Sequence, residues 1–279
     1  MDLEAIVKQI HSCIEHDKQI TFLIGAGLSV DSGIPTFRGE EGYWTVGSKN
    51  YQPEEMATFQ MFSQAPKEVW NWYLYRKSIC LNAKPNEGHH NLKKIQHLLD
   101  TSCSIVSQNV DGLLSRVGIK ASNTYHIHGD LDYVRCTKPC TTLKIPFPDS
   151  IEVLNYKKNC LSDSDWKSLH CPECGSLMRP HVLWFDESYN QTHYSLNSVM
   201  KKIEQTGILF IIGTSLTTNL PSTIVQYVLS NNERVIEINP NSSDFSKLLQ
   251  DAANGQSFQS GSSQFLAQLF KQLSSFKKG

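Results

Sequence analysis

Several polar side chains that could carry out acid–base chemistry stand directly after short apolar runs. Gln108, Asn109 and Asp111 follow one such run, and His128 follows another. In an open α/β sheet these positions lie at the carboxyl ends of parallel strands, which is the edge where ligands bind. A neutral imidazole at that edge can act as a general base near neutral pH. His126 points to the same face of an ideal strand, so the spacing alone does not choose between the two histidines.

A glycine-rich turn follows the apolar run 20–24. Gly25, Ala26 and Gly27 should leave backbone N–H groups uncovered at the end of a buried strand. A pyrophosphate can approach such groups and the N-terminus of the helix that we expect to follow. The spacing is not that of the dinucleotide fingerprint Gly-x-Gly-x-x-Gly, and a lone Gly-Ala-Gly often marks only a turn. The stretch therefore predicts an anion-binding turn without identifying the ligand.

Four cysteines form two close pairs separated by a polar stretch without strong periodicity. Cys136 and Cys140 form the first pair, and Cys171 and Cys174 form the second. Four thiolates satisfy tetrahedral Zn²⁺ and leave no position for an activated water, so this zinc site should stabilise the structure and not catalyse. Cys160 lies between the pairs and is the alternative fourth ligand.

Hydrophobic periodicity predicts the elements that position these groups. Apolar runs predict strands at 20–24, 103–108, 124–128, 181–185, 208–212 and 234–239, of which the last closes the sheet. Helical spacing predicts helices at 1–17, 65–80, 88–99, 192–205 and 262–276. Strands that are almost continuously apolar and alternate with helices are typical of a doubly wound parallel sheet, so the predicted fold is α/β and Rossmann-like.

We expect the chain to form one domain over residues 1–279. Two stretches interrupt the α/β pattern: a helical insertion with a cofactor loop at 40–100 and a small zinc-binding module at 132–180. Within the first, residues 45–55 are polar and should form a mobile loop.

Composition and charge exclude some classes of partner. The chain has 279 residues and a formal net charge of −1, which favours neither a nucleic-acid surface nor a membrane surface. The N-terminal helix carries charges throughout and is not a signal peptide, and no apolar run is long enough to span a bilayer. The eight cysteines should then be reduced thiols or metal ligands in a cytoplasmic protein. We expect a monomer whose partners are small molecules or protein segments.

Taken whole, residues 25–39 closely resemble the sirtuin signature Gly-Ala-Gly-x-Ser-x-x-Ser-Gly-Ile-Pro-x-Phe-Arg. Residues 108–112 match the family's Gln-Asn-(Ile/Val)-Asp-Gly, and 179–187 resemble its Arg-Pro-x-Val-Val-x-Phe-Gly-Glu strand. The motifs occur in family order, and the resemblance runs from about Ile20 to the C-terminus. It implies an NAD-dependent protein-lysine deacylase that acts on acyl-lysine proteins or peptides and releases nicotinamide and O-acyl-ADP-ribose.

The resemblance also implies roles for individual residues. A His-Gly pair carries the catalytic histidine of the family, which selects His128, while Asn109 and Asp111 act around the nicotinamide and the ribose. The acyl-lysine peptide is implied to pair with the strand that holds Val182 and Phe185. The residues implied to bind NAD are Gly25, Ala26, Gly27, Ser29, Thr36, Phe37, Arg38, Gln108, Asn109, Asp111, Gly213, Thr214, Ser215, Asn239 and Ser262.

Other positions resemble the class III branch, which removes succinyl and malonyl groups. Thr36 stands where most sirtuins have Asp, and Ala57 matches a small residue that widens the acyl pocket. Tyr73 and Arg76 match the pair that binds the acyl carboxylate in that branch. Residues at i and i+3 share one face of a helix, so a hydroxyl and a guanidinium can converge there on one acidic group.

Some residues depart from the family pattern and keep two alternatives open. Asp186 replaces a glycine beside the peptide strand, and Asp130 replaces the usual serine after His128-Gly129. These departures favour an NAD glycohydrolase or ADP-ribosyltransferase on the same scaffold. The second alternative is a module that binds NAD or ADP-ribose without turnover. The presence of Asn109, Asp111 and His128 argues against it, because a module that only binds needs no general base.

Overall fold

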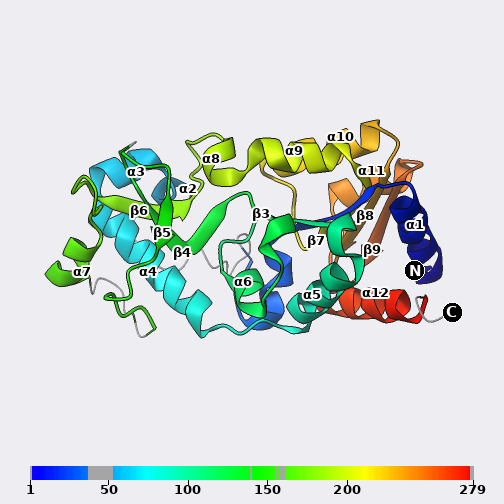
Figure 1. The fold of residues 1–279 in the computed structure, drawn as a ribbon, viewed down its shortest axis with the longest axis horizontal. Helices are drawn as coiled ribbons and strands as arrows, with labels where there is room; N and C mark the ends of the chain where they lie inside the picture. The colour runs from blue at the N-terminus through cyan, green and yellow to red at the C-terminus, as the bar shows by residue number, and fades with distance from the viewer. Residues whose placement is uncertain (1, 37–52, 139, 155, 157–160, 277–279) are drawn as a thin grey trace.

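The computed structural model describes residues 2–36, 53–138, 140–154, 156 and 161–276. Two lobes are visible along the long axis (Figure 1): a larger one built on a parallel sheet, which holds both termini, and a smaller one with its own sheet and helices. None of the helices in these residues is long and apolar enough to cross a membrane.

The larger lobe is organised around a six-stranded parallel sheet with the order β3-β2-β1-β7-β8-β9. Its strands are β1 (Gln19–Ile24), β2 (Cys103–Ser107), β3 (Thr124–His126), β7 (Thr206–Ile212), β8 (Arg234–Asn239) and β9 (Gly255–Gln259). Every residue of β1, β2 and β7 is buried, as their apolar runs require. The chain leaves β1 for β2 on one side and later adds β7 on the other, so the strand order reverses at β1. Ligands of open α/β sheets bind at such a point.

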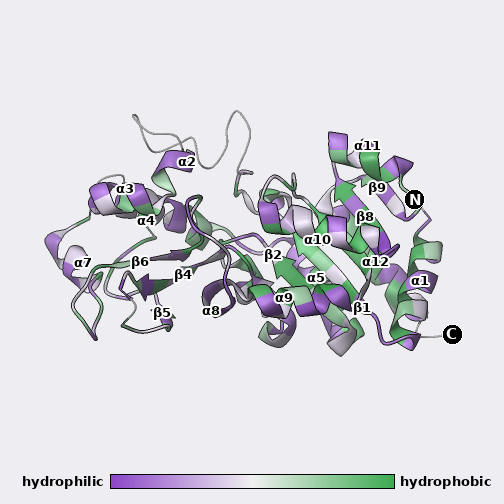
Figure 2. Cartoon of the chain, turned by 90° about the horizontal axis from the view of Figure 1, so that it is seen from above, coloured by the Kyte–Doolittle hydropathy of each residue, from purple (hydrophilic) through white to green (hydrophobic). Residues whose placement is uncertain are grey.

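Helices cover both faces of this sheet, which confirms the predicted doubly wound α/β fold. Because side chains alternate along a strand, Phe22 and Ile24 belong to the core on one face and Leu23 to the core on the other. The first face is covered by α1 (Leu3–Glu15), α5 (Glu87–Leu99), α6 (Leu113–Val117) and α12 (Ser262–Phe276). The second is covered by α9 (Leu196–Glu204), α10 (Asn219–Ser230) and α11 (Asp244–Asp251). Figure 2 shows the hydrophobic strands enclosed between more polar outer helices.

The smaller lobe contains one apolar core built from two separate stretches of the chain. Its antiparallel sheet, in the order β5-β4-β6, consists of β4 (Gly129–Cys136), β5 (Lys144–Pro146) and β6 (Met178–Val182). Its helices are α2 (Pro53–Met56), α3 (Phe59–Gln64), α4 (Pro66–Asn82) and α7 (Asp163–Ser168). Trp70 of α4 is buried in this core and its indole N–H donates to the carbonyl of Met178, 3.0 Å away. The helical insertion and the cysteine-containing segment therefore pack as one body.

Several predicted elements differ from the structure. The helix expected after β1 is two short 3₁₀ turns, Ala26–Leu28 and Val30–Ser32, because Gly33 with φ of 80° ends the helical path. The strand expected at 181–185 is β6, which begins earlier, at Met178, and pairs in the small sheet. The helix expected at 192–205 is divided at Ser195, where φ is 54°, into α8 (Gln191–Tyr194) and α9.

The parallel sheet also contains a strand that was not predicted, and 234–239 is therefore not its last strand. β9 follows β8 and pairs with it along its whole length. None of its five residues is fully buried, and Phe258 is its one large apolar side chain. A mobile loop was predicted at 45–55. Residues 45–52 lie outside the described residues, and residues 53–55 belong to α2.

The junction between the lobes depends on Gly129, the first residue of β4. Its φ is 87°, and a Cβ added there would lie 1.9 Å from the carbonyl oxygen of His181. Gly129→Ala should lower the free energy of unfolding by about 1–2 kcal/mol for backbone strain and by a further ~1–3 kcal/mol for overpacking. Urea unfolding measures this loss. Gly175 is the matched control, since its φ is 68° and a Cβ there would meet nothing within 4 Å; equal losses in the two variants would contradict the packing argument.

Candidate functional site

The turns after β1 and β7 touch backbone to backbone at the centre of the sheet edge. A Cβ on Gly27 would lie 2.5 Å from Cα of Gly213, and one on Gly25 would lie 2.4 Å from Cβ of Thr214. The amides of Gly25 and Gly27 donate to the carbonyls of Ile212 and Gly213 at 2.9 and 2.8 Å. The expectation that all three turn amides are uncovered is therefore wrong: the glycines allow two turns to pack closely. Of the three turn amides, only that of Ala26 has no partner among the described residues.

A buried polar cluster lies next to these turns. The Ser29 hydroxyl donates to Asp111 Oδ2 at 2.6 Å, and Asp111 Oδ1 accepts the amide of Leu113 at 2.9 Å. Asn109 Nδ2 donates to the Gly25 carbonyl at 3.0 Å and lies 3.3 Å from Ser29 Oγ. The structure thus brings together three of the predicted residues, and both oxygens of the Asp111 carboxylate are engaged.

Gln108 connects three loops at this edge. Its Nε2 donates to Thr214 Oγ1 at 3.0 Å, and its Oε1 accepts from Thr218 Oγ1 at 3.3 Å. Its backbone carbonyl lies 3.1 Å from Nδ1 of His128. The segment after β2 therefore holds the segments after β3 and β7 in fixed positions.

His128 is held in one neutral form by its two partners. A carbonyl oxygen can only accept a hydrogen bond, so the proton of the neutral ring lies on Nδ1 and the lone pair lies on Nε2. Nε2 is 2.9 Å from the hydroxyl of Tyr189, which must therefore be the donor. Burial lowers the pKa of His128 to about 4, and the hydrogen bond to the Gln108 carbonyl opposes this shift. The imidazole is thus uncharged at neutral pH and can accept a proton at Nε2.

His126, the alternative base, has a different environment. It is the last residue of β3, and burial lowers its pKa while the carboxylate of Asp130 opposes that shift. Asp130 is itself buried, and its Oδ1 accepts the amide of Asp132 at 2.8 Å. Both histidines therefore bond to the backbone of the segment after β2, His126 at Asn109 and His128 at Gln108, but His126 lies beside a buried carboxylate and His128 beside the Tyr189 hydroxyl.

The remaining predicted cofactor residues lie on the loops around this edge. Thr36 is half-buried, Ser215 is exposed, Asn239 ends β8 and Ser262 begins α12. The first turn of α12 is tied to the turn after β1, because Ser263 Oγ donates to Asp31 Oδ2 at 2.6 Å. The predicted residues Phe37 and Arg38 lie outside the described residues.

The predicted acyl-pocket residues line the neighbouring part of the small lobe. Tyr73 and Arg76 are buried one turn apart on α4, and the Arg76 guanidinium stacks on the Trp72 ring at 3.4 Å. The Tyr73 hydroxyl accepts the indole N–H of Trp184 at 2.8 Å, and burial raises the pKa of Tyr73. Tyr73 therefore contacts the segment that follows β6, while Arg76 is held against Trp72 of its own helix.

That segment is fixed to α3 by contacts that the sequence did not predict. The amide of Phe185 donates to the carbonyl of Ala57 at 3.0 Å. The Asp186 carboxylate accepts the amides of Phe59 and Gln60 at 2.8 and 3.0 Å, which places its charge against the first turn of a helix. Phe185 itself is half-exposed, while Val182 is buried at the end of β6.

Glu187 anchors the other end of this segment. Its carboxylate pairs with the guanidinium groups of Arg179 and Arg135, and it accepts the Trp184 amide at 3.0 Å. Arg179 also stacks on the Trp184 ring at 3.3 Å. One carboxylate thus meets two guanidinium groups and a backbone amide, and these bonds hold the segment from 184 to 187 against β4 and β6.

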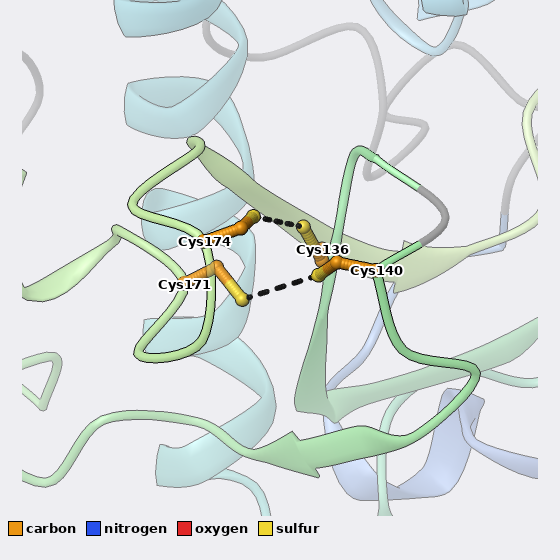
Figure 3. Close-up of side chains that lie close together, drawn as sticks. All are labelled: Cys136, Cys140, Cys171 and Cys174. Atoms are coloured by element: carbon orange, nitrogen blue, oxygen red, sulfur yellow. Dashed lines mark hydrogen bonds between the residues drawn. The ribbon is translucent and has the colours of Figure 1, made fainter.

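The four predicted cysteines meet in the small lobe (Figure 3). Cys136 and Cys140 come from the end of β4 and the turn after it, and Cys171 and Cys174 from a turn before β6. All four sulfurs lie within 4.8 Å of one another, with Sγ–Sγ distances of 3.5 Å (Cys136–Cys174) and 3.7 Å (Cys140–Cys171). Tetrahedral zinc with Zn–S bonds of about 2.3 Å would place sulfurs about 3.8 Å apart. The donor set and spacing fit zinc; the alternative ligand Cys160 lies outside the described residues.

Comparisons with known proteins agree with this fold and site. A family model described as the Sir2 family matches residues 25–219. The chain is 37% identical over 229 residues to the NAD-dependent protein deacylase of Leptospira interrogans (serovar Lai), covering 82% of this chain and 84% of the relative. It is 32% identical over 243 residues to NAD-dependent protein deacylase 1 of Archaeoglobus fulgidus, covering 87% and 90%. The chain belongs to the Sir2 family, the sirtuins that its motifs resemble.

Solved structures give the same result. A mutant Sir2 homologue in complex with ADP-ribose superposes with a TM-score of 0.78 at 31% identity, covering 100% of this chain and 98% of the other. A complex of a Sir2 homologue with NAD superposes with a TM-score of 0.77 at 29% identity, covering 98% and 94%.

Removing one cysteine of the cluster should release the metal. In Cys171→Ser we expect the bound zinc to fall from one ion per chain to almost none, and the small lobe to lose several kcal/mol of stability, because zinc binding contributes to folding. Atomic emission spectrometry and thermal unfolding measure the two effects. Cys13→Ser is the control, since Cys13 is a thiol of α1 in the other lobe. Unchanged zinc content in Cys171→Ser would contradict the assignment.

Proposed function

We propose that this protein is an NAD-dependent protein-lysine deacylase that removes acetyl groups and also the acidic succinyl and malonyl groups. The observation that carries the proposal is the state of His128. Its Nδ1–H donates to the Gln108 carbonyl, and its Nε2 lone pair accepts the hydroxyl of Tyr189 at the ligand edge of the sheet. A ring held in this way is a general base in the form that can accept a proton.

The residues at the sheet edge fit an NAD molecule. The amide of Ala26, which has no partner among the described residues, and the half-exposed loops after β1, β7 and β8 can hold phosphates and ribose hydroxyls, and the strand order reverses there. When bound, NAD supplies the ribose carbon from which nicotinamide leaves and to which the acyl oxygen becomes attached. The family names of the relatives support this cofactor.

Within this reaction each polar group has a separate task. His128 accepts the proton of a ribose hydroxyl at Nε2, which activates the oxygen that attacks the acyl carbon. Asn109 and Asp111 orient the ribose and the leaving group from their buried cluster beside Ser29. The acyl-lysine peptide lies along the segment that contains Val182 and Phe185.

Preference for acidic acyl groups is supported by the packing of α4. Arg76 is buried and stacked on Trp72, so its charge is poorly solvated, and a carboxylate that reaches it would be bound strongly. Tyr73 shares that face of the helix. The carboxylate of Asp186 faces the amides of α3, so it does not have to repel an acidic acyl group.

The same contacts weigh against the glycohydrolase and transferase alternative. Asp186 and Asp130, which favoured it, are both occupied by backbone amides. Nicotinamide release from NAD without any peptide would support the alternative. The cytoplasmic location and the monomeric state remain predictions.

Matched acetyl-lysine and succinyl-lysine peptides test the acyl preference. We expect the protein to remove succinyl in preference to acetyl, and Arg76→Met to reduce kcat/KM for the succinyl peptide about ten- to a hundred-fold, since a hydrogen bond to a charged group contributes about 1.5–3 kcal/mol. Mass spectrometry of the peptides measures both. Lys77→Met is the control, because Lys77 is the next buried cation on α4 and pairs with Asp132. An unchanged succinyl-to-acetyl ratio in Arg76→Met would exclude a role for Arg76 in selectivity.

The protonation state of His128 predicts the pH dependence of acyl transfer. The base must be neutral, so activity is present above its pKa and is lost below it; with a pKa of about 4, activity should persist well below the ordinary histidine value of 6.5. His128→Ala should lose acyl transfer at every pH and still bind ADP-ribose. The pH profile of kcat/KM and calorimetry provide these measurements. Full deacylation by His128→Ala would refute the assignment.

A further inference from the structure

The hydroxyl of Tyr189 occupies the only lone pair of the His128 ring. Because Nδ1 carries the ring proton toward the Gln108 carbonyl, Nε2 is the sole acceptor, and Tyr189 Oη is 2.9 Å from it. A substrate hydroxyl can therefore deliver its proton to Nε2 in two ways only: it displaces the phenol, or it passes the proton through the phenol oxygen.

The packing around Tyr189 opposes displacement. Two residues before it, Glu187 is anchored by Arg179 and Arg135. Directly after it, Asn190 caps α8 by accepting the amide of His193 at 2.8 Å. The ring itself packs against the apolar core of the second sheet face. A tyrosine fixed on both sides and by its ring has little freedom to swing away from the histidine.

The phenol oxygen has the chemistry that a relay needs. Burial raises the pKa of Tyr189 to about 12, so the group stays a neutral O–H donor at neutral pH. Its oxygen keeps lone pairs that can accept a hydrogen bond from a substrate. Both Tyr189 and His128 are only partly buried, which leaves the pair accessible from the ligand edge.

We propose that Tyr189 is a proton relay between the substrate ribose hydroxyl and His128. By donating to Nε2, it also holds the imidazole in the tautomer whose lone pair lies on that nitrogen. In the transfer step the ribose O–H bond breaks and its proton joins the Tyr189 oxygen. At the same time the Tyr189 proton moves to His128 Nε2, which becomes imidazolium, and the phenol ends the step neutral. The ribose oxygen is then free to form its bond to the acyl carbon. The inference rests on the proposed deacylase reaction, and no further reactant is needed.

Tyr189→Phe tests the relay because it removes one oxygen and keeps the packed ring. We expect kcat for O-acyl-ADP-ribose formation to fall about ten- to a hundred-fold, within the range that a positioned proton-transfer group supplies. KM should change little, and nicotinamide release that precedes the proton transfer should be retained. Tyr227→Phe is the control, since Tyr227 is a half-buried tyrosine of α10 that packs against the same core.

Nitrogen NMR of the ligand-free protein supplies a readout that does not depend on turnover. With ¹⁵N-labelled histidine, and His128→Ala to assign the signal, wild-type His128 should show a protonated Nδ1 and a hydrogen-bonded, unprotonated Nε2. In Tyr189→Phe the Nε2 signal should shift and the pKa of His128 should rise, because the donor that stabilises the neutral ring is gone.

The possible outcomes separate the relay from the deacylase assignment. Acyl transfer in Tyr189→Phe that equals or exceeds that of the wild type, with His128→Ala inactive, overturns the relay alone. A wild-type protein that forms no acyl product from any acyl peptide overturns the deacylase reaction and the relay with it. Slow acyl transfer together with the shifted Nε2 signal, and no change in Tyr227→Phe, supports both.

Discussion

The structure depends on the close contact between the turns after β1 and β7. Gly27 and Gly213 approach so closely that no side chain fits between them, and the Gly27 amide donates to the Gly213 carbonyl. This contact fixes the carbonyl of Gly25, which holds Asn109, and the side chain of Thr214, which holds Gln108. The polar groups at the edge of the sheet are thus ordered by backbone packing and not by their own flexible side chains.

The second constraint is the way in which the small lobe is attached to this edge. β6 pairs with β4 directly after His128, and the Leu183 amide donates to the His128 carbonyl at 2.9 Å. The segment that follows is held by Asp186 on α3 and by Glu187 on its two arginines. A peptide that binds along this segment therefore contacts a surface whose position relative to the base is already set, which favours catalysis through orientation.

The sequence predicted those features that depend on local pattern. The central strands are apolar throughout, and the cysteine pairs have ligand spacing, so both could be recognised without knowledge of the fold. β9 was missed because Gly255–Gln259 holds a single large apolar residue. The role of the turn glycines was misjudged because Gly213 lies far away in the sequence and its contact with Gly27 cannot be read from either motif. Tyr189 lies in a short polar stretch without periodicity, and only the path of the chain from β6 to α8 brings it to His128.

The position of β1 in the sheet has a consequence for synthesis on the ribosome. It precedes every other strand of the described residues, yet its neighbour β7 follows roughly 190 residues later, which corresponds to roughly 10–40 s of translation. Until then one edge of a strand with fully buried Ile20, Phe22 and Ile24 has no partner. A nascent apolar strand with an open edge is prone to pair with other chains. An apolar edge that waits this long for its partner is the kind of surface that chaperones cover during synthesis.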